Sequence, residues 1–429
     1  MKKITKDAIN IEEASFIVIL ILLIGLPLLK LTSYNLQISE KINDSFQLNH
    51  VWLLWLSIPF LFYFYLEGVV TKKIKINYID IFIYFLIITA IISTVFAIDK
   101  YISIFGERRR QEGLLSILAY YLMFLNAKNI KSIEYKRILI KVFIAAGLVQ
   151  VLYGILQVYT NFGFIKRYSQ MPYMASGLSG NPNFLGSYMV MNTLIMITLY
   201  LLNDKKIYLF LASIFFIGIC IASSTGPFLG FILAVLFLSI YYRKKIKLKN
   251  MIITLLLFIA IYEIVNISLM FVQENIFGNL IDDSYNIKKD LLLARRQLTN
   301  GDLGKIGSGR IEIWKNSIPL AKKYWTVGAG LDNFGIVYGV HDGIYYDKAH
   351  NVYLQLLITN GLDSLIAYLS LCAIICFKGL KIKENTDISL YIAFIGYSIQ
   401  AFANISVIDV APMFFIIFGM LAQLINESK

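Results

Sequence analysis

The rarest side chain able to act as a base lies where a polar segment becomes apolar. His350, one of three histidines, stands in 349-AHNVYLQLLITNGL-362 beside Asn351, whose amide can hydrogen-bond a polar ligand. A neutral imidazole near pH 7 is the most available general base in proteins. We therefore predict that His350 accepts a proton in a reaction. The alternative is a histidine that only caps a helix at an interface, and we expect His50 and His341 to be interfacial or solvated.

Three consecutive arginines, Arg108, Arg109 and Arg110, lie in 99-DKYISIFGERRRQEG-113. Guanidinium groups donate paired hydrogen bonds that match phosphate oxygens. The alternative is that the two neighbouring glutamates simply offset these charges at the level of lipid headgroups. We expect Arg109 or Arg110 to bind an anion.

A fourth arginine, Arg310, lies in 307-GSGRIEIW-314. Ser308 or Gly309 is expected to cap a short amphipathic helix there, so Arg310 would fall in its first turn. The free N–H groups and the dipole of a first turn also favour anions. The alternative is a surface arginine stacked on Trp314.

An asparagine-rich turn, 176-SGLSGNPNFLG-186, precedes another apolar run. Asn181 and Asn183 have amide groups suited to sugar hydroxyls, although Asn-Pro is also an ordinary turn initiator. We expect both asparagines to contact a substrate.

Several common kinds of site are missing from the sequence. The glycines of 328-GAGLDNFG-335 lack the preceding strand and the following lysine of a nucleotide-binding loop. Cys220, Cys372 and Cys376 lie in apolar runs, without the polar surroundings of a zinc site or a disulfide framework. We expect no cofactor and no metal ion.

The elements that must position these residues are membrane helices. The chain has 429 residues, of which 58% are hydrophobic and 16% charged, and its mean hydropathy is +0.67. Its apolar runs are long enough to cross a bilayer of about 30 Å as helices, and they lack the alternation of a barrel strand. We predict an all-α integral membrane protein with about twelve transmembrane helices near 14–31, 51–70, 77–98, 113–127, 138–160, 184–202, 207–224, 226–242, 251–271, 363–378, 388–407 and 411–425.

The charge pattern predicts the orientation. Basic short loops alternate with loops that carry no such excess, so the net charge of +13 reflects topology and no nucleic-acid partner is expected. The basic loops and both termini are predicted to be cytoplasmic. Residues 1–271 would form nine helices, 272–349 an extracytoplasmic cap and 350–429 three more helices. The basic loops are 72-KKIK-75, 128-KNIKSIEYKR-137, 203-NDKK-206, 243-RKKIKLK-249 and 378-KGLKIKE-384.

These motifs together resemble a known family. The sequence is similar to the bacterial O-antigen ligase and O-antigen polymerase superfamily over roughly residues 100 to 425. The resemblance rests on His350 with Gly361, Arg109 with Gly113, 180-GNPNFLG-186, and 309-GRIEIW-314 followed by 328-GAGLDNF-334.

The resemblance implies a multispanning glycosyltransferase fold of the C type in the bacterial cytoplasmic membrane. It implies an undecaprenyl-diphosphate-linked glycan as donor, a glycan, lipid or cell-wall acceptor, and a metal-independent reaction that inverts the anomeric centre. The family's histidine corresponds to His350, and its diphosphate-binding arginines to Arg109 or Arg110 and to Arg310. Many members carry Ser-Arg-Gly at a turn where this chain has 224-STG-226, so one phosphate contact is missing or is supplied by the arginine cluster.

A transporter or flippase for lipid-linked saccharides is the alternative function. It should place ionisable or helix-breaking residues near the bilayer midplane and often has repeated halves. This chain concentrates such residues at one face, which favours an enzyme. The sequence leaves polymerase and ligase equally open.

Overall fold

The computed structural model describes residues 10–35, 48–108, 110–160, 174–276, 295–299, 307, 309–341 and 343–427. Two residues with predicted roles, Arg109 and Ser308, lie outside the described residues. Over the described part the chain is mostly helical, with one short antiparallel hairpin, β1 (Val340–His341) and β2 (Ile344–Tyr345). The prediction of an all-α architecture is confirmed.

A helix covers each of the twelve predicted spans, and seven of the helices, α1, α2, α3, α6, α7, α10 and α15, are long and apolar enough to cross a membrane. The chain is thus a multi-pass membrane protein, while the count of twelve crossings stays a prediction. The helices over these spans are α1 (Ile11–Asn35), α2 (Leu48–Val70), α3 (Tyr78–Val95), α5 (Leu114–Lys128), α6 (Ile133–Tyr159), α7 (Pro182–Asn203), α8 (Lys206–Ala222), α9 (Thr225–Tyr241), α10 (Leu248–Ile276), α15 (Leu362–Gly379), α16 (Asn385–Gln400) and α17 (Ala411–Glu427).

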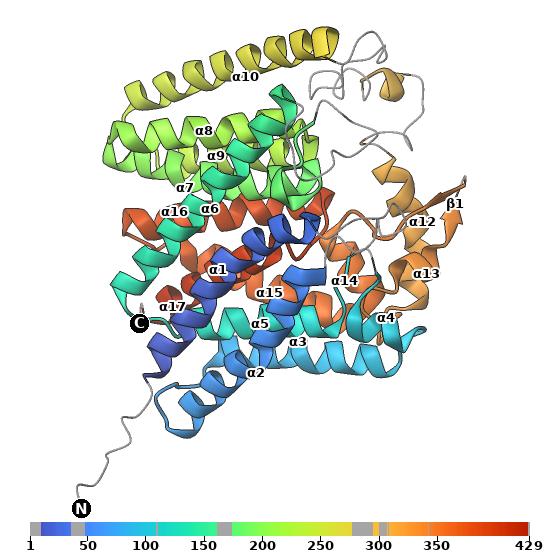
Figure 1. Cartoon of the computed structure of the whole chain (residues 1–429). Helices are drawn as coiled ribbons and strands as arrows, with labels where there is room; N and C mark the ends of the chain where they lie inside the picture. The colour runs from blue at the N-terminus through green and yellow to red at the C-terminus, as the bar shows by residue number, and fades with distance from the viewer. Residues whose placement is uncertain are drawn as a thin grey trace, which may run out of the picture.

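Helix α7 lies at the centre of the bundle. Its apolar segment is 94% buried, whereas that of α10, at the edge of the molecule in Figure 1, is 17% buried. A helix that is apolar on all sides lies either in lipid or among other helices, and α7 lies among other helices. Helices α8, α9 and α16 pack on α7. The first turn of α7 therefore has a fixed place, and Asn183 belongs to that turn.

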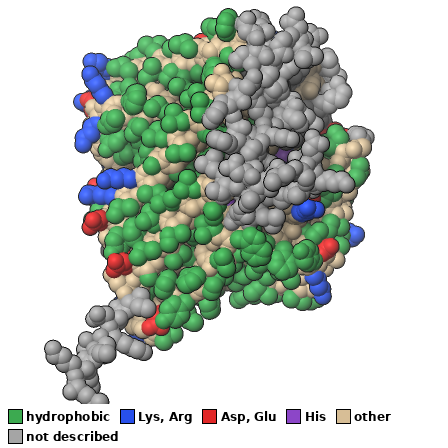
Figure 2. All heavy atoms as spheres, viewed as in Figure 1, with side chains coloured by type: hydrophobic (Ala, Val, Ile, Leu, Met, Phe, Trp, Pro, Cys, Tyr) green, Lys and Arg blue, Asp and Glu red, His purple; other side chains and the backbone are tan. Residues whose placement is uncertain are grey.

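The two ends of the bundle differ in chemistry. The Lys and Arg side chains visible in Figure 2 gather mainly along the left edge, where the C terminus also lies in Figure 1. We call this the basic end. The opposite end, here called the cap end, carries the short elements α4 (Lys100–Phe105), η3 (Gly177–Ser179), α12 (Arg310–Lys323), α13 (Phe334–Tyr338), the hairpin, α14 (Val352–Asn360) and η6 (Ala401–Ala403).

The cap end has a small hydrophobic core of its own. Five side chains are buried together there: Ile313 of α12, Phe334 and Tyr338 of α13, Ile358 of α14, and Ala349 from the segment before α14. The amphipathic helix predicted near 308–325 is confirmed as α12, which begins after Gly309 in the left-handed conformation with φ +79°. The cap is thus a packed unit that can hold side chains rigidly.

Helix α14 is a feature that the hydropathy pattern did not predict. It ends at Gly361, whose φ of +88° separates it from α15. A Cβ on Gly361 would lie 2.2 Å from the carbonyl oxygen of Thr326, so only glycine fits. The next residue, Leu362, donates its N–H to the carbonyl oxygen of Trp325 at 2.7 Å. Gly361 therefore separates α14 from α15 and fixes α14 against the cap.

The orientation of the two ends can be measured with a thiol reagent that does not cross membranes. In a protein whose three native cysteines are replaced by alanine, Lys322→Cys places an exposed thiol on α12, and Lys244→Cys places one in the loop between α9 and α10. We expect labelling of Lys322→Cys in intact cells, and of Lys244→Cys only after permeabilisation, because the basic loops belong in the cytoplasm. The opposite labelling pattern would invert the topology.

Candidate functional site

The backbone at His350 is held from two sides. His350 itself has the left-handed φ of +50°. The preceding residue, Ala349, donates its N–H to the Gln355 side-chain oxygen at 2.8 Å and accepts the Trp314 indole N–H at 3.0 Å. Because Gln355 belongs to α14 and Trp314 to α12, the backbone that carries His350 has a fixed position between these helices.

His350 does not cap α14. That role belongs to Asn351, whose side-chain oxygen accepts the N–H groups of Tyr353 and Leu354, both at 3.0 Å. His350 is therefore not the residue that caps this helix. The same bonds show that the oxygen of Asn351 stabilises the helix start, which the sequence analysis had assigned to ligand contact.

The surroundings of His350 keep it uncharged. Burial, followed by the positive charges of Arg310 and Arg110, lowers the pKa of His350 to about 4, while Asp347 opposes the shift. An imidazole with this pKa is neutral at physiological pH and has a free electron pair for a proton. The two arginines are thus close enough to act on the histidine electrostatically.

Arg310 connects the cap to the central helix. It lies in the first turn of α12, and its guanidinium is 3.5 Å from the side-chain oxygen of Asn183 in the first turn of α7. The same oxygen accepts a hydrogen bond from the hydroxyl of Ser224, the residue before α9. Three separate sequence segments, around 183, 224 and 310, thus meet at one point.

Asn181 and Asn404 also form hydrogen bonds near the start of α7. Asn181 caps α7, since its side-chain oxygen accepts the N–H of Asn183 at 2.9 Å. Asn404, between α16 and α17, donates its amide to the Ser187 hydroxyl at 2.7 Å. The role of Asn181 at the start of α7 is the ordinary turn function that the sequence left as an alternative.

Of the two described arginines of the cluster, Arg110 points into the site and Arg108 is exposed. The guanidinium of Arg110 pairs with the carboxylate of Asp347, and its carbon lies 5.4 Å from the centre of the Phe184 ring in α7. Asp347 is therefore the direct partner of Arg110, and Glu112 contributes to offsetting its charge without a direct ion pair. The position of Arg109 is outside the described residues.

A buried charge network next to His350 was missed by the sequence analysis. The ammonium of Lys348 lies 2.6 Å from a carboxylate oxygen of Asp332 and 3.1 Å from one of Glu112. Although burial lowers it, these two carboxylates raise the pKa of Lys348 above its ordinary value. Burial raises the pKa of Glu112 to about 7, against the effect of Lys348. The charged residues of 347-DKAH-350 beside the histidine could have indicated such a network, but Glu112 lies 236 residues from Lys348 in the sequence.

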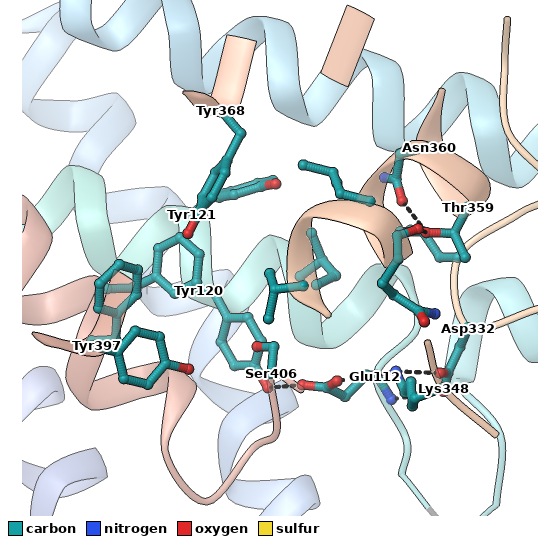
Figure 3. A pocket seen from close by; sticks show the side chains of 17 residues that line it. Glu112, Tyr120, Tyr121, Asp332, Lys348, Thr359, Asn360, Tyr368, Tyr397 and Ser406 are labelled. Atoms are coloured by element: carbon teal, nitrogen blue, oxygen red, sulfur yellow. Dashed lines mark hydrogen bonds and ion pairs between the residues drawn. The ribbon is translucent and has the colours of Figure 1, made fainter. Parts of the chain in front are cut away.

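A cavity of about 90 Å³ lies behind this network, between helices α5, α14, α15, α16 and α17. Figure 3 shows Glu112, Asp332 and Lys348 at one end of it and tyrosine rings, among them Tyr121 and Tyr397, at the other. A space of this size holds a few water molecules. The network therefore borders, on its inner side, a mostly apolar space that is large enough for water.

The other two histidines have different surroundings. His341 is exposed on β1, as predicted. The prediction that His50 is interfacial or solvated was wrong, because its side chain is 1% exposed and lies 3.7 Å from the carboxylate of Asp409. Lys30 pairs with the same carboxylate. Lys30 of α1 and His50 of α2 meet the segment just before α17 at Asp409, and the position of His50 at a helix entrance did not indicate this burial.

Three helix starts and two arginines surround His350. The first turns of α7 and α12 meet through Asn183 and Arg310, and α14 begins directly after His350. Helix starts carry free N–H groups and partial positive charge, so the arrangement suits an anionic ligand. Among the described residues, no group of three His, Cys, Asp or Glu side chains could hold a metal ion.

Comparison with known proteins agrees with the motifs. No curated protein sequence matches the chain significantly. Residues 209–369, from α8 into α15, match the family model described as O-Antigen ligase. Arg310 and His350 lie inside this segment, whereas Arg110 and Asn183 lie before it. This matched segment, which is less than half of the chain, supports the resemblance to the O-antigen ligase and polymerase superfamily that the motifs indicate.

Proposed function

We propose that this protein transfers glycan from an undecaprenyl-diphosphate-linked donor to an acceptor hydroxyl at the extracytoplasmic face of the bacterial cytoplasmic membrane. The observation that carries the proposal is the meeting of Arg110, Arg310 and a neutral His350 at the cap end of a multi-pass bundle. The proposal rests equally on the family match over the segment that contains Arg310 and His350.

The donor's diphosphate is the anion that this site suits. Breaking the bond between the anomeric carbon and the phosphate oxygen builds negative charge on the leaving diphosphate. Arg310 and Arg110 offer guanidinium forks to that charge, and the first turns of α7 and α12 add N–H groups. Together these groups supply the charge stabilisation that a metal ion gives in other transferases, which supports a metal-independent reaction.

Arg110 is well placed to replace the missing family arginine. The turn that holds 224-STG-226 contacts Asn183 through Ser224, and Arg110 lies against Phe184, the next residue of α7. We infer that Arg110 supplies from the 99–113 segment the phosphate contact that other members take from this turn.

His350 would act on the acceptor. The acceptor oxygen attacks the anomeric carbon from the face opposite the diphosphate, a carbon–oxygen bond forms as the bond to the diphosphate breaks, and the hydroxyl proton passes to the imidazole. This geometry inverts the anomeric centre. Once the diphosphate offsets the two arginines, the imidazole becomes a stronger base, because the charges that lower its pKa are balanced. The amide groups of Asn181, Asn183 and Asn351 would hydrogen-bond sugar hydroxyls of the substrates.

The transporter alternative has weaker support. A transporter binds its cargo near the bilayer midplane. Here the arginines, His350 and the Lys348 network all gather at the cap end, and the buried pair of Lys128 and Asp80 lies at the basic end.

The acceptor distinguishes a polymerase from a ligase. Purified protein would be given lipid-diphosphate glycan, alone and with candidate lipid, wall or glycan acceptors. A ladder of products from donor alone indicates a polymerase, and a single transfer to one acceptor indicates a ligase. Unchanged donor under all conditions, in protein shown to be folded, would refute transferase activity.

Replacing His350 with alanine should abolish most turnover. A positioned general base contributes about 10²–10⁴ in rate, so His350→Ala should lose that factor in kcat while donor affinity changes little. The measurement is single-turnover transfer by purified, folded protein. His341→Ala, in the exposed hairpin, is the matched control and should keep wild-type turnover. Undiminished transfer by His350→Ala would show that the histidine has no part in the chemistry.

Replacing Arg310 with glutamine should have two separate effects. Donor affinity should fall by about tenfold or more, because a hydrogen bond to a charged group is worth about 1.5–3 kcal/mol. The acidic limb of the kcat/KM profile should also move upward from about 4 toward the ordinary histidine value, since loss of a nearby cation favours protonated His350. Lys322→Gln, on the exposed face of α12, should change neither. An unchanged pH profile would show that Arg310 does not affect the pKa of His350.

A further inference from the structure

Three segments that carry or adjoin the proposed catalytic groups meet at one buried ammonium. Lys348 lies two residues before His350, Glu112 two residues after Arg110, and Asp332 in the segment that leads into α13. The side chains of Lys348, Glu112 and Asp332 are 5%, 4% and 0% exposed. A cation so deeply buried is stable only with both carboxylates in place, and neither carboxylate is stable without it.

The carboxylate of Asp332 also binds the segment from Glu107 to Glu112, here called the arginine loop. One of its oxygens faces Lys348, and the other accepts the backbone N–H of Glu107 at 2.7 Å and of Glu112 at 3.2 Å. These two residues flank the three arginines. The ends of the arginine loop are thus fastened to a carboxylate whose own position depends on Lys348.

A second connection runs through the neighbour of Lys348. Asp347 pairs with the guanidinium of Arg110, so residues 347 and 348 bind the arginine loop at two separate points. The same short run continues through Ala349, fixed by Trp314, to His350. Any change in the position of Lys348 would therefore alter the spacing between Arg110 and His350.

We propose that Lys348 is a positioning residue that sets the distance between the diphosphate-binding Arg110 and the base His350 by clamping Glu112 and Asp332. Lys348 does not itself touch the substrate, because its ammonium is already occupied by two carboxylates. This inference rests on the proposed function for the identity of the groups positioned, but the clamp itself can be measured without any activity.

The chain provides a matched control for a purely structural lysine. Lys128 pairs with Asp80, and these side chains are 3% and 0% exposed, as buried as the Lys348 network. The pair joins α5 to the start of α3 at the basic end, away from Arg110 and His350. Lys128→Met and Lys348→Met should therefore lose comparable thermal stability. Only Lys348→Met should also lose donor affinity and transfer rate.

The test compares these two variants, and Lys348→Arg, in purified detergent-solubilised protein. In Lys348→Met, the affinity for undecaprenyl diphosphate and the single-turnover rate of glycan transfer should each fall at least tenfold. Lys128→Met should stay within about twofold of wild type in both. Lys348→Arg, which keeps the charge, should recover most of the affinity. Loss of activity only in proportion to stability, alike in both methionine variants, would overturn the proposal.

Hydrogen exchange gives a readout that is independent of activity. The amides of Glu107 and Glu112 should exchange at least tenfold faster in Lys348→Met than in wild type and be unchanged in Lys128→Met. Unchanged exchange in Lys348→Met would overturn the clamp even if activity fell. If Lys348→Met does not fold, Lys348→Gln should show the same directions of change. A wild-type protein that neither binds undecaprenyl diphosphate nor transfers glycan, yet shows the faster exchange in the variant, would refute the proposed function and leave the clamp standing.

Discussion

A single buried cation joins the parts of this site that come from distant regions of the chain. Lys348 lies between Asp332 and Glu112 at 2.6 and 3.1 Å, and Asp332 in turn fastens the arginine loop by two backbone hydrogen bonds. Burying three charges is costly unless each is matched in geometry. The match exists only when the arginine loop, the cap and the segment before α14 are all in place. The assembly of the site and the folding of the cap end are thus one event.

Electrostatic interactions also determine the protonation state of the proposed base, His350. Arg110 and Arg310 create a positive field at the starts of α7 and α12, and together with burial that field lowers the pKa of His350 to about 4. His350 is therefore a neutral but weak base. An anionic donor would cancel part of the field and strengthen the base at the moment when it is needed. Donor binding and proton acceptance would then be linked by Coulomb interactions, without any movement of the backbone.

Hydropathy and helix-capping rules predicted much of this architecture, because the apolar runs and the start of α12 are determined by local sequence. Local patterns also indicated His350, a rare polar residue at the start of an apolar segment, and Arg310, in the first turn of an expected helix. The Lys348 network could not be predicted in the same way, because its partners are more than two hundred residues apart in sequence. The burial of His50 likewise depends on Asp409, which only the packed helices bring near. Local patterns thus identified the groups at the site, and tertiary contacts determined how they are held.

The central claim is that a lipid diphosphate binds between the two arginines beside His350. An experimental structure of the protein with undecaprenyl diphosphate, determined by electron cryomicroscopy, tests it most directly. The account predicts phosphate oxygens in contact with Arg110 and Arg310, at the first turns of α7 and α12, with the imidazole of His350 facing the position of the anomeric carbon. A diphosphate bound at the basic end, or one that touches neither arginine, would contradict the account.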